Sequence, residues 1–345
     1  MEIGRQLDRY MQAQVNQHHF TGTVLVARNG RLLLAKGYGF ANVEWQVPNT
    51  LRTKFRLGSI TKQFTATLIM QLREEGRVDL QDSICKYLSP CVAAWRPVTL
   101  AHLLSHTSGI AGYGGKPQPA SSSAPPWTAD EIAATFRDRP LDFAPGTKWQ
   151  YSDWGYCLLG LVIEKVTGKP YATVLRERIF GPLGMNDSGY DRSDVILKQR
   201  AAGYRLEGDR LLNAAYTDMA GPYAAGGLYS TADDLYKWDQ ALYSNAVLPQ
   251  RALELMWTEV ISNYGYGWMV SRPTSTSAQP PWVLPGRFQV VHPGNIAGFS
   301  TEILRFPDDH VTVIVLANLE NANTIGPVLA AMVFGEKFSL PSAHR

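Results

Sequence analysis

Strand-forming segments lie near both ends of the chain, and tight turns join them into hairpins. Residues 22–27 and 31–36 form one pair around Asn29-Gly30, and Asn-Gly is a strong hairpin signal because both central turn positions need positive φ. Three more candidates follow near the other end: residues 288–292, 300–306 and 311–318. Hairpins at opposite ends of one chain predict a single antiparallel sheet to which both termini contribute.

The stretch between the two groups of strands has mainly helical patterning. Helices are expected at residues 3–17 and 321–334, beside the strands, and internally at residues 100–104, 129–136, 156–166 and 232–243. We therefore predict an α+β fold in which helices flank the sheet and a mostly helical lobe is inserted. The 345 residues would form one domain of two lobes: an α/β lobe of about residues 1–60 and 280–345, and a helical lobe of about residues 61–279.

Composition excludes several classes of protein. The chain is 45% hydrophobic and 18% charged, as expected of a globular protein with a large core. Its net charge of +3 without a run of Lys or Arg gives no support to nucleic-acid binding. Apolar runs such as residues 157–163 are too short to span a bilayer. Residues 1–5 show no signal peptide, which predicts a cytoplasmic protein if the chain is complete and a periplasmic or secreted one if a signal was removed.

The three cysteines, Cys85, Cys91 and Cys157, are few and odd in number. We interpret them as buried reduced thiols, with a Cys85–Cys91 disulfide in an oxidising compartment as the alternative. No His, Cys and Asp cluster has metal-ligand spacing, so neither zinc nor another cofactor is expected. The absence of a Gly-x-Ser-x-Gly elbow and of a Gly-rich phosphate loop argues against an α/β-hydrolase and a nucleotide enzyme.

The tetrad Ser59-Ile60-Thr61-Lys62 opens an apolar run with helical i, i+4 spacing. Ser59 is expected at a helix N-terminus, where outward N–H groups and the helix dipole favour developing negative charge. Lys62 lies one turn further on the same face. A hydroxyl is a poor nucleophile until a base takes its proton, and a desolvated lysine with a lowered pKa can do so. The alternative for Ser59 is an N-cap serine with a solvated lysine behind it.

A second tetrad of the same form occurs at Ser83-Ile84-Cys85-Lys86. No glycine precedes its serine and no long apolar helix follows it, in contrast to Ser59. We interpret this copy as a turn and a short loop helix without a catalytic role.

Together with two later motifs, the first tetrad resembles the penicillin-recognising serine hydrolases, which carry Ser-x-x-Lys, Tyr-x-Asn and Lys-Thr-Gly boxes. The corresponding segments here are Ser59 to Lys62, Tyr151-Ser152-Asp153 and His292-Pro293-Gly294. This version looks like the class C β-lactamase branch, which also contains family VIII carboxylesterases, DD-carboxypeptidases and D-aminopeptidases. Further segments with the family's appearance are residues 20–27, 103–109, 145–147, 182–185 and 225–231. The resemblance covers roughly residues 18–320 and implies a β-lactamase/transpeptidase-like fold.

Two boxes depart from the family pattern. Asp153 stands where the family usually has Asn, and His292 replaces Lys, a change that the class C branch tolerates. A literal Tyr-x-Asn occurs at Tyr243-Ser244-Asn245, but it follows an apparent helix and directly precedes a loop, so we reject it as the second box. His106 looks like a family turn residue that hydrogen-bonds locally.

The resemblance implies acyl transfer, in which Ser59 Oγ attacks a carbonyl and water later releases the acid. Lys62 and Tyr151 would share the proton transfers, and Tyr151 would act as a base if Lys62 and a charged His292 lowered its pKa. Carried over from the family, the oxyanion hole consists of the backbone N–H groups of Ser59 and Asn295. The other expected substrate-binding residues are Asp153, His292 and Gly294, the last allowing close approach of the substrate to its strand.

Asp153 bears on which substrates the site prefers. An ionised Asp only accepts hydrogen bonds, whereas Asn also donates. Asp153 is expected to pair with Lys62 and keep it cationic, which makes Tyr151 the favoured base and weakens recognition of a substrate amide. A structural salt bridge without effect on selectivity is the alternative.

We therefore expect a carboxylesterase that acts on short-acyl esters, with weak β-lactam hydrolysis. The alternatives are a D-amino-acid peptidase, a DD-carboxypeptidase or a β-lactamase on the same fold, and an acyltransferase to an alcohol or amine. A further class is a sensor or scaffold without turnover, against which the presence of Ser59, Lys62 and Tyr151 argues. The expected partner is a small-molecule ester or amide.

Overall fold

The structure is a computed structural model that describes residues 2–110, 139–275, 282–322 and 324–336. The helix predicted at residues 129–136 lies outside the described residues. In the part of the chain that the structure describes, no helix is both long enough and apolar enough to cross a membrane.

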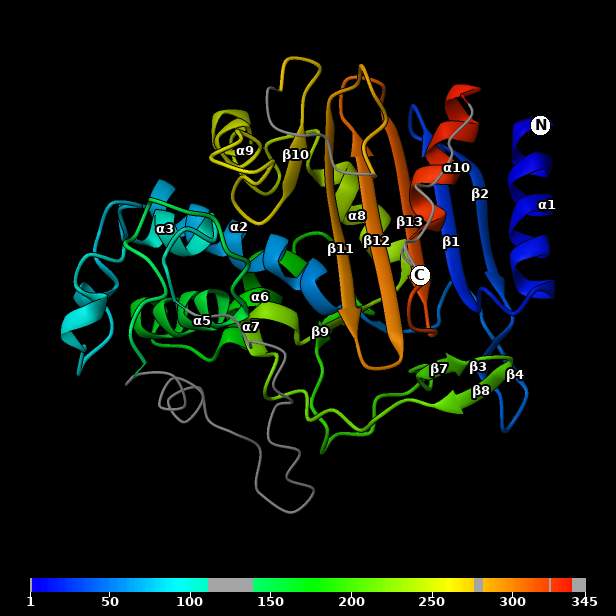
Figure 1. The fold of residues 1–345 in the computed structure, drawn as a ribbon, viewed down its shortest axis with the longest axis horizontal. Helices are drawn as coiled ribbons and strands as arrows, with labels where there is room; N and C mark the ends of the chain where they lie inside the picture. The colour runs from blue at the N-terminus through cyan, green and yellow to red at the C-terminus, as the bar shows by residue number, and fades with distance from the viewer. Residues whose placement is uncertain (1, 111–138, 276–281, 323, 337–345) are drawn as a thin grey trace.

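A six-stranded antiparallel sheet dominates the molecule, with the strand order β10-β11-β12-β13-β1-β2 (Figure 1). Its strands are β1 (Gly22–Arg28), β2 (Arg31–Tyr38), β10 (Met269–Ser271), β11 (Gln289–Ile296), β12 (Phe299–Phe306) and β13 (Val311–Ala317). N-terminal β1 pairs with C-terminal β13 from Gly22 opposite Ala317 to Arg28 opposite Val311. The prediction that both termini build one sheet is confirmed, as is the turn at Asn29 and Gly30, whose φ angles are +51° and +72°.

The two faces of the sheet support two separate cores because side chains alternate along each strand. On the outer face, Val24, Val313 and Leu304 pack with α1 (Glu2–Asn16) and α10 (Ile325–Phe334). On the inner face, Leu25, Ile303 and Ile314 belong to the core that includes α2 (Thr61–Glu74) and α8 (Ala232–Ala241). Figure 1 shows α10 in front of the sheet and α8 behind it.

The remaining elements are short, apart from the helix of the second box. The helices are α3 (Leu100–Leu104), α5 (Asp153–Thr167), α6 (Tyr171–Leu175), α7 (Tyr223–Gly226) and α9 (Gln250–Met256). Three-residue 3-10 turns are η1 (Gly58–Ile60), η2 (Ile84–Lys86) and η3 (Ala93–Trp95), and η4 (Arg176–Phe180) is a π-helical segment. The minor strands are β3 (Phe40–Asn42), β4 (Val47–Pro48), β5 (Phe55–Arg56), β6 (Gly189–Tyr190), β7 (Tyr204–Glu207), β8 (Arg210–Asn213) and β9 (Leu228–Ser230).

The α+β fold class is confirmed, with several local differences; the strand expected at residues 288–292, for example, continues to Ile296 as β11. The helix expected at residues 156–166 begins earlier, at Asp153, because the Ser152 side chain caps it by accepting the Gly155 N–H at 3.2 Å. The C-terminal helix begins at Ile325 instead of residue 321. Strand β10 was not expected, since three residues are too few to show alternation. The division into two lobes stays a prediction.

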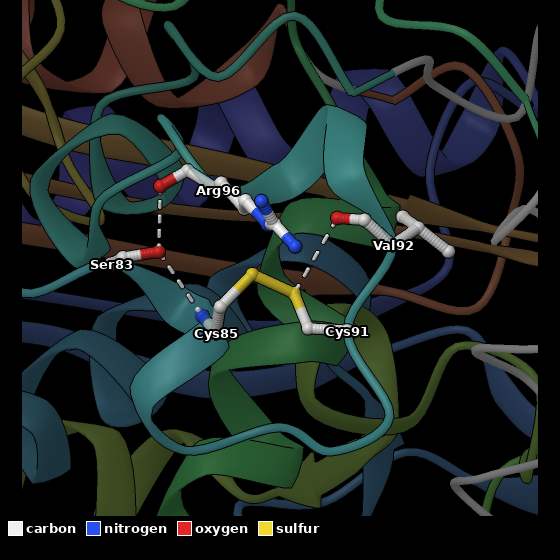
Figure 2. Close-up of a disulfide and its surroundings, with 5 residues drawn as sticks. All are labelled: Ser83, Cys85, Cys91, Val92 and Arg96. Atoms are coloured by element: carbon white, nitrogen blue, oxygen red, sulfur yellow. Dashed lines mark hydrogen bonds between the residues drawn. A yellow bond between two sulfur atoms is a disulfide. The ribbon is translucent and has the colours of Figure 1, made fainter.

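The interpretation of all three cysteines as reduced thiols is wrong for two of them. Cys85 and Cys91 form a disulfide with a Cα–Cα distance of 5.3 Å, while Cys157 is free and buried. Figure 2 shows the disulfide beside Ser83, whose Oγ accepts the Cys85 N–H and donates to the Arg96 carbonyl. Cys85 lies within the turn η2, which brings it close to Cys91, a proximity that cysteine counting cannot reveal.

Candidate active site

Ser59 lies in the tight turn η1, immediately before α2 and not within its first turn. The preceding Gly58 has φ +54°, and a Cβ there would lie 2.9 Å from Asn295 N and 3.0 Å from Asn295 O. Only glycine fits this close approach with positive φ. The close approach of Gly58 to Asn295 places the Ser59 turn directly against β11 of the sheet.

Lys62 is a buried side chain whose three donors all have partners. Its Nζ donates to Ser59 Oγ at 3.0 Å, to Asp153 Oδ1 at 2.6 Å and to the Ala225 carbonyl at 2.9 Å. Burial acts to lower the pKa of Lys62, but attraction to Asp153 and Tyr151 outweighs it, so the pKa lies above its ordinary value. The expectation that Asp153 keeps Lys62 cationic is confirmed. The expectation of a lowered lysine pKa is wrong for the resting site.

The second box is held in place by a histidine from another segment. His106 follows α3 with φ +60°, and its Nδ1 accepts the Ser152 N–H at 3.1 Å across 46 residues of sequence. Its ring packs on Tyr151 with 4.2 Å between centroids. Burial, with repulsion from the nearby Lys62 charge, holds the pKa of His106 well below its usual value, so the ring stays neutral and Nδ1 can accept. The expected local hydrogen bond of His106 is present at its backbone, whose N–H donates to the Leu103 carbonyl at 3.4 Å. The partner of its side chain, in contrast, lies in the second box.

Tyr151 packs beside Lys62, whose Nζ lies 4.7 Å from the centre of the phenol ring. Burial raises the pKa of Tyr151, Lys62 opposes that rise, and Asp153 adds to it, leaving the pKa above its ordinary value. Tyr151 is thus a neutral phenol in the resting site. The expectation that nearby cations lower its pKa is contradicted, because burial and the Asp153 charge outweigh the effect of Lys62.

His292 faces an aromatic group on the inner side of the sheet. Its Nδ1 donates to the Pro293 carbonyl at 2.6 Å, which leaves Nε2 to accept from Tyr264 Oη at 3.0 Å. Burial and the nearby Lys62 charge lower the pKa of His292 to about 3. The expected charged His292 is therefore wrong. Tyr264 is its hydrogen-bond partner, and no motif in the sequence connects the two residues.

Gly294 and Asn295 connect the third box to the nucleophile turn. A Cβ on Gly294 would lie 2.0 Å from the Leu57 carbonyl oxygen, so the space that this glycine leaves is filled by the chain itself. Thr301 Oγ1 also donates to the Leu57 carbonyl, at 2.7 Å. The backbone of Asn295 consequently lies beside Gly58, one residue before Ser59. The oxyanion hole formed by the Ser59 and Asn295 N–H groups stays a prediction compatible with this geometry.

The family model described as beta-lactamase matches residues 7–332. The chain belongs to the beta-lactamase family. As a member, it is a serine hydrolase, and its resemblance to the penicillin-recognising serine hydrolases is confirmed, while the assignment of the three boxes stays a prediction.

Several known proteins are similar to this beta-lactamase-family protein over most of its chain. The putative penicillin-binding protein PbpX of Bacillus subtilis (strain 168) is 32% identical over 310 residues, which cover 90% of this chain and 73% of PbpX. Teichoic acid D-alanine hydrolase of Staphylococcus aureus is 32% identical over 233 residues, covering 68% of this chain and 56% of that protein. The structure of the octameric penicillin-binding protein homologue from Pyrococcus abyssi matches with a TM-score of 0.83 at 30% identity, covering 98% of this chain and 78% of the other.

In the two motifs that we rejected in this beta-lactamase-family enzyme, the key side chains make contacts that stabilise the local structure. Ser83 Oγ donates to the Arg96 carbonyl at 2.8 Å, while the 58% exposed Lys86 pairs with Asp82. In the literal Tyr-x-Asn, the tyrosine ring instead stacks on His310 with 4.7 Å between centroids. Across residues 2–110, 139–275, 282–322 and 324–336, no group of three His, Cys, Asp or Glu side chains is placed to hold a metal ion.

The buried neutral His292 predicts a loss of stability in acid. Its folded-state pKa of about 3 lies below the ordinary 6.5, so its contribution to stability is present above pH 6.5 and is lost as pH falls toward 3. His292→Gln should therefore lose less melting temperature between pH 7 and pH 4 than the wild type, as measured by differential scanning calorimetry. His19→Gln, at an exposed position, is the matched control. Equal acid-induced losses in the His292 variant and the wild type would refute a neutral buried His292.

Proposed function

We propose that the enzyme hydrolyses esters of short acyl groups through an acyl-enzyme on Ser59. The observation that carries this proposal is the Lys62–Asp153 pair, joined at 2.6 Å with Lys62 Nζ also 3.0 Å from Ser59 Oγ. One carboxylate oxygen of Asp153 accepts a hydrogen bond from Lys62, and a carboxylate has no N–H that could donate to a substrate amide. An ester needs no such donor, so the substitution of Asp for the family's Asn favours esters over amides.

The proton of Ser59 leaves through the same pair. Lys62 passes one proton to the Asp153 carboxylate as its amine nitrogen accepts the proton of Ser59 Oγ, so that Lys62 ends as an ammonium and Asp153 as a neutral carboxyl. Oγ forms the new bond to the carbonyl carbon in this step. The 2.6 Å contact between Lys62 Nζ and Asp153 Oδ1 gives this proton a direct path to the carboxylate. Tyr151, a neutral phenol, donates to the departing alkoxide oxygen.

A panel of p-nitrophenyl esters from acetate to decanoate tests the proposal. The highest kcat/KM should fall at acetate or butyrate, and a rapid quench should yield protein carrying one acyl group on the peptide that contains Ser59. A maximum at long chains would contradict the short-acyl preference, and turnover without an acyl adduct on Ser59 would contradict the mechanism.

Hydrolysis of D-alanyl compounds is the second candidate function. It is favoured by the similarity to the teichoic acid D-alanine hydrolase, which is 32% identical over 233 residues. The Ser59 and Lys62 arrangement would serve both functions, and the distinction lies in the acyl group. Faster hydrolysis of a D-alanyl ester than of the propionyl ester, whose acyl chain has the same length, would select this candidate, with the L-alanyl ester as the stereochemical control.

Asp153→Asn should raise the ratio of anilide to ester hydrolysis. The Asn side chain regains an N–H donor for the carbonyl of a substrate amide, which is a stronger acceptor than an ester carbonyl, and one such hydrogen bond changes the ratio of kcat/KM values by about 2- to 10-fold. Loss of the Asp153 charge also leaves burial to dominate the pKa of Lys62, so the acid limb of the pH–rate profile should move to lower pH. The matched control is Asp187→Asn, which removes the charge from an aspartate paired with Lys54 outside the Ser59–Lys62 cluster. An unchanged ratio would show that the Lys62–Asp153 pair does not govern selectivity.

A further inference from the structure

A cavity of about 430 Å³ lies against the face of β11 and β12 that points away from Ser59. Side chains alternate along β12, so Thr301, which reaches Leu57, points to the Ser59 side, while Glu302 points to the opposite side. On that side Glu302 contacts the beginning of α10, the helix in front of the sheet in Figure 1. The lining residues used below are Trp282, Pro293, Asn295, Glu302, Leu304 and Pro327.

Glu302 is a buried carboxyl group at this cavity. It is only 6% exposed, and its Oε2 accepts the Gly326 N–H at 2.8 Å. Among the described residues, no hydrogen bond to Oε1 is formed, and none of the described lining residues is a lysine or arginine. Burial raises the pKa of Glu302 to about 8. On α1, burial and then the charge of Glu302 raise the pKa of Tyr10. A buried carboxylate without a cation is unfavourable, so an incoming cation would relieve this cost.

The walls of the cavity determine what kind of cation fits. Trp282, Leu304 and Pro327 provide apolar surface, and the volume lies in the range of small-molecule sites. An indole ring also attracts an organic cation through its π face. His292 contributes to the lining as well, but its Nε2 bonds Tyr264 on the other side of the strand. We propose that this cavity binds a small organic ammonium ion, with its charge on Glu302 and its apolar part against Trp282.

Binding in this cavity is coupled to the reaction through β11. Pro293 and Asn295 line the cavity, and the backbone of Asn295 is the group that packs against Gly58 beside the nucleophile. A ligand that displaces this strand changes the position of Ser59 relative to Asn295. The cavity is therefore an effector site whose occupancy alters the rate of ester hydrolysis, whichever acyl group the enzyme prefers.

Calorimetric titration of the Ser59→Ala protein with 2-phenylethylamine tests the binding, because without the nucleophile the amine cannot act as an acyl acceptor. At pH 8, the amine should bind at least tenfold more tightly than the neutral 2-phenylethanol, and Glu302→Gln should weaken amine binding at least tenfold. The affinity for the amine should rise from pH 6 to pH 8 because a larger fraction of Glu302 is ionised at the higher pH. Equal affinity for amine and alcohol, or unchanged binding in Glu302→Gln, would overturn the proposal.

Two further variants separate ligand binding from folding. Trp282→Ala should weaken binding of the amine at least threefold. Glu207→Gln, which replaces an exposed carboxylate on β7, should leave the affinity for the amine unchanged. Glu302→Gln should melt higher than the wild type at pH 8 and similarly at pH 4, because the folded state favours the uncharged side chain. In wild-type enzyme the amine should change kcat for p-nitrophenyl butyrate. If the amine changed kcat of the Glu302→Gln variant by the same factor, it would be acting in the active site. That result would contradict the coupling between the cavity and the reaction.

Discussion

Ser59→Ala should lower kcat/KM for p-nitrophenyl butyrate by at least about 10⁴-fold, since removal of a catalytic nucleophile eliminates the covalent route. Lys62 Nζ lies 3.0 Å from Ser59 Oγ, and Gly58, the residue before Ser59, packs against the Asn295 backbone. Steady-state kinetics with active-site titration would measure the effect. Because the substitution is small, it should leave the melting temperature within a few degrees of the wild type.

The chain supplies its own control for this experiment. Ser83 belongs to a tetrad with the same Ser-x-x-Lys form, but its Oγ bonds the Arg96 carbonyl and its lysine is exposed. Ser83→Ala should therefore retain kcat/KM within about twofold of the wild type. A large loss in Ser83→Ala, or substantial residual turnover in Ser59→Ala, would contradict the assignment of the nucleophile.

Asp239→Ala should reduce the free energy of unfolding by about 3–5 kcal/mol, the usual cost of removing one partner from a buried ion pair. Asp239 of α8 pairs with Arg305 of β12, and both side chains are 0% exposed. The Arg305 guanidinium also lies over the Tyr243 ring at 4.6 Å, so it cannot reach water once its partner is removed. Urea denaturation followed by circular dichroism would measure the change.

The matched control for the buried pair is Glu177→Ala, which breaks an ion pair with Lys169 whose side chains are 51% and 45% exposed. Surface pairs contribute about 0–1 kcal/mol, so this variant should remain close to the wild type. The double variant Asp239→Leu with Arg305→Met should recover much of the lost stability, because no unpaired buried charge remains. Equal effects of the buried and exposed substitutions would contradict the importance of the Asp239–Arg305 pair.

The sequence predicted those parts of the enzyme that depend on local patterns. Hairpin turns with Asn29 and Gly30 defined β1 and β2, and helix spacing placed Lys62 within reach of Ser59. The replacement of Asn by Asp153 was enough to predict the ion pair with Lys62, because an ionised Asp only accepts hydrogen bonds and pairs with a nearby cation.

Features that depend on the folded environment could not be read from the chain. The charge states of Tyr151 and His292 depend on burial, which the boxes themselves do not encode, so both expected pKa values were wrong. The contact of His106 with the second box spans 46 residues and became visible only in the fold. A bulky residue at a turn position with φ +60° is the signal that, with backbone information, would have identified it.

The most direct test of the central claim is the ratio of kcat/KM for p-nitrophenyl butyrate to that for D-alanyl p-nitroanilide, measured side by side with Ser59→Ala as control. The Lys62–Asp153 pair predicts fast ester turnover, negligible anilide cleavage and loss of ester turnover in the variant. Anilide cleavage comparable to or faster than ester cleavage would contradict the ester preference and assign the enzyme to amide or peptide substrates.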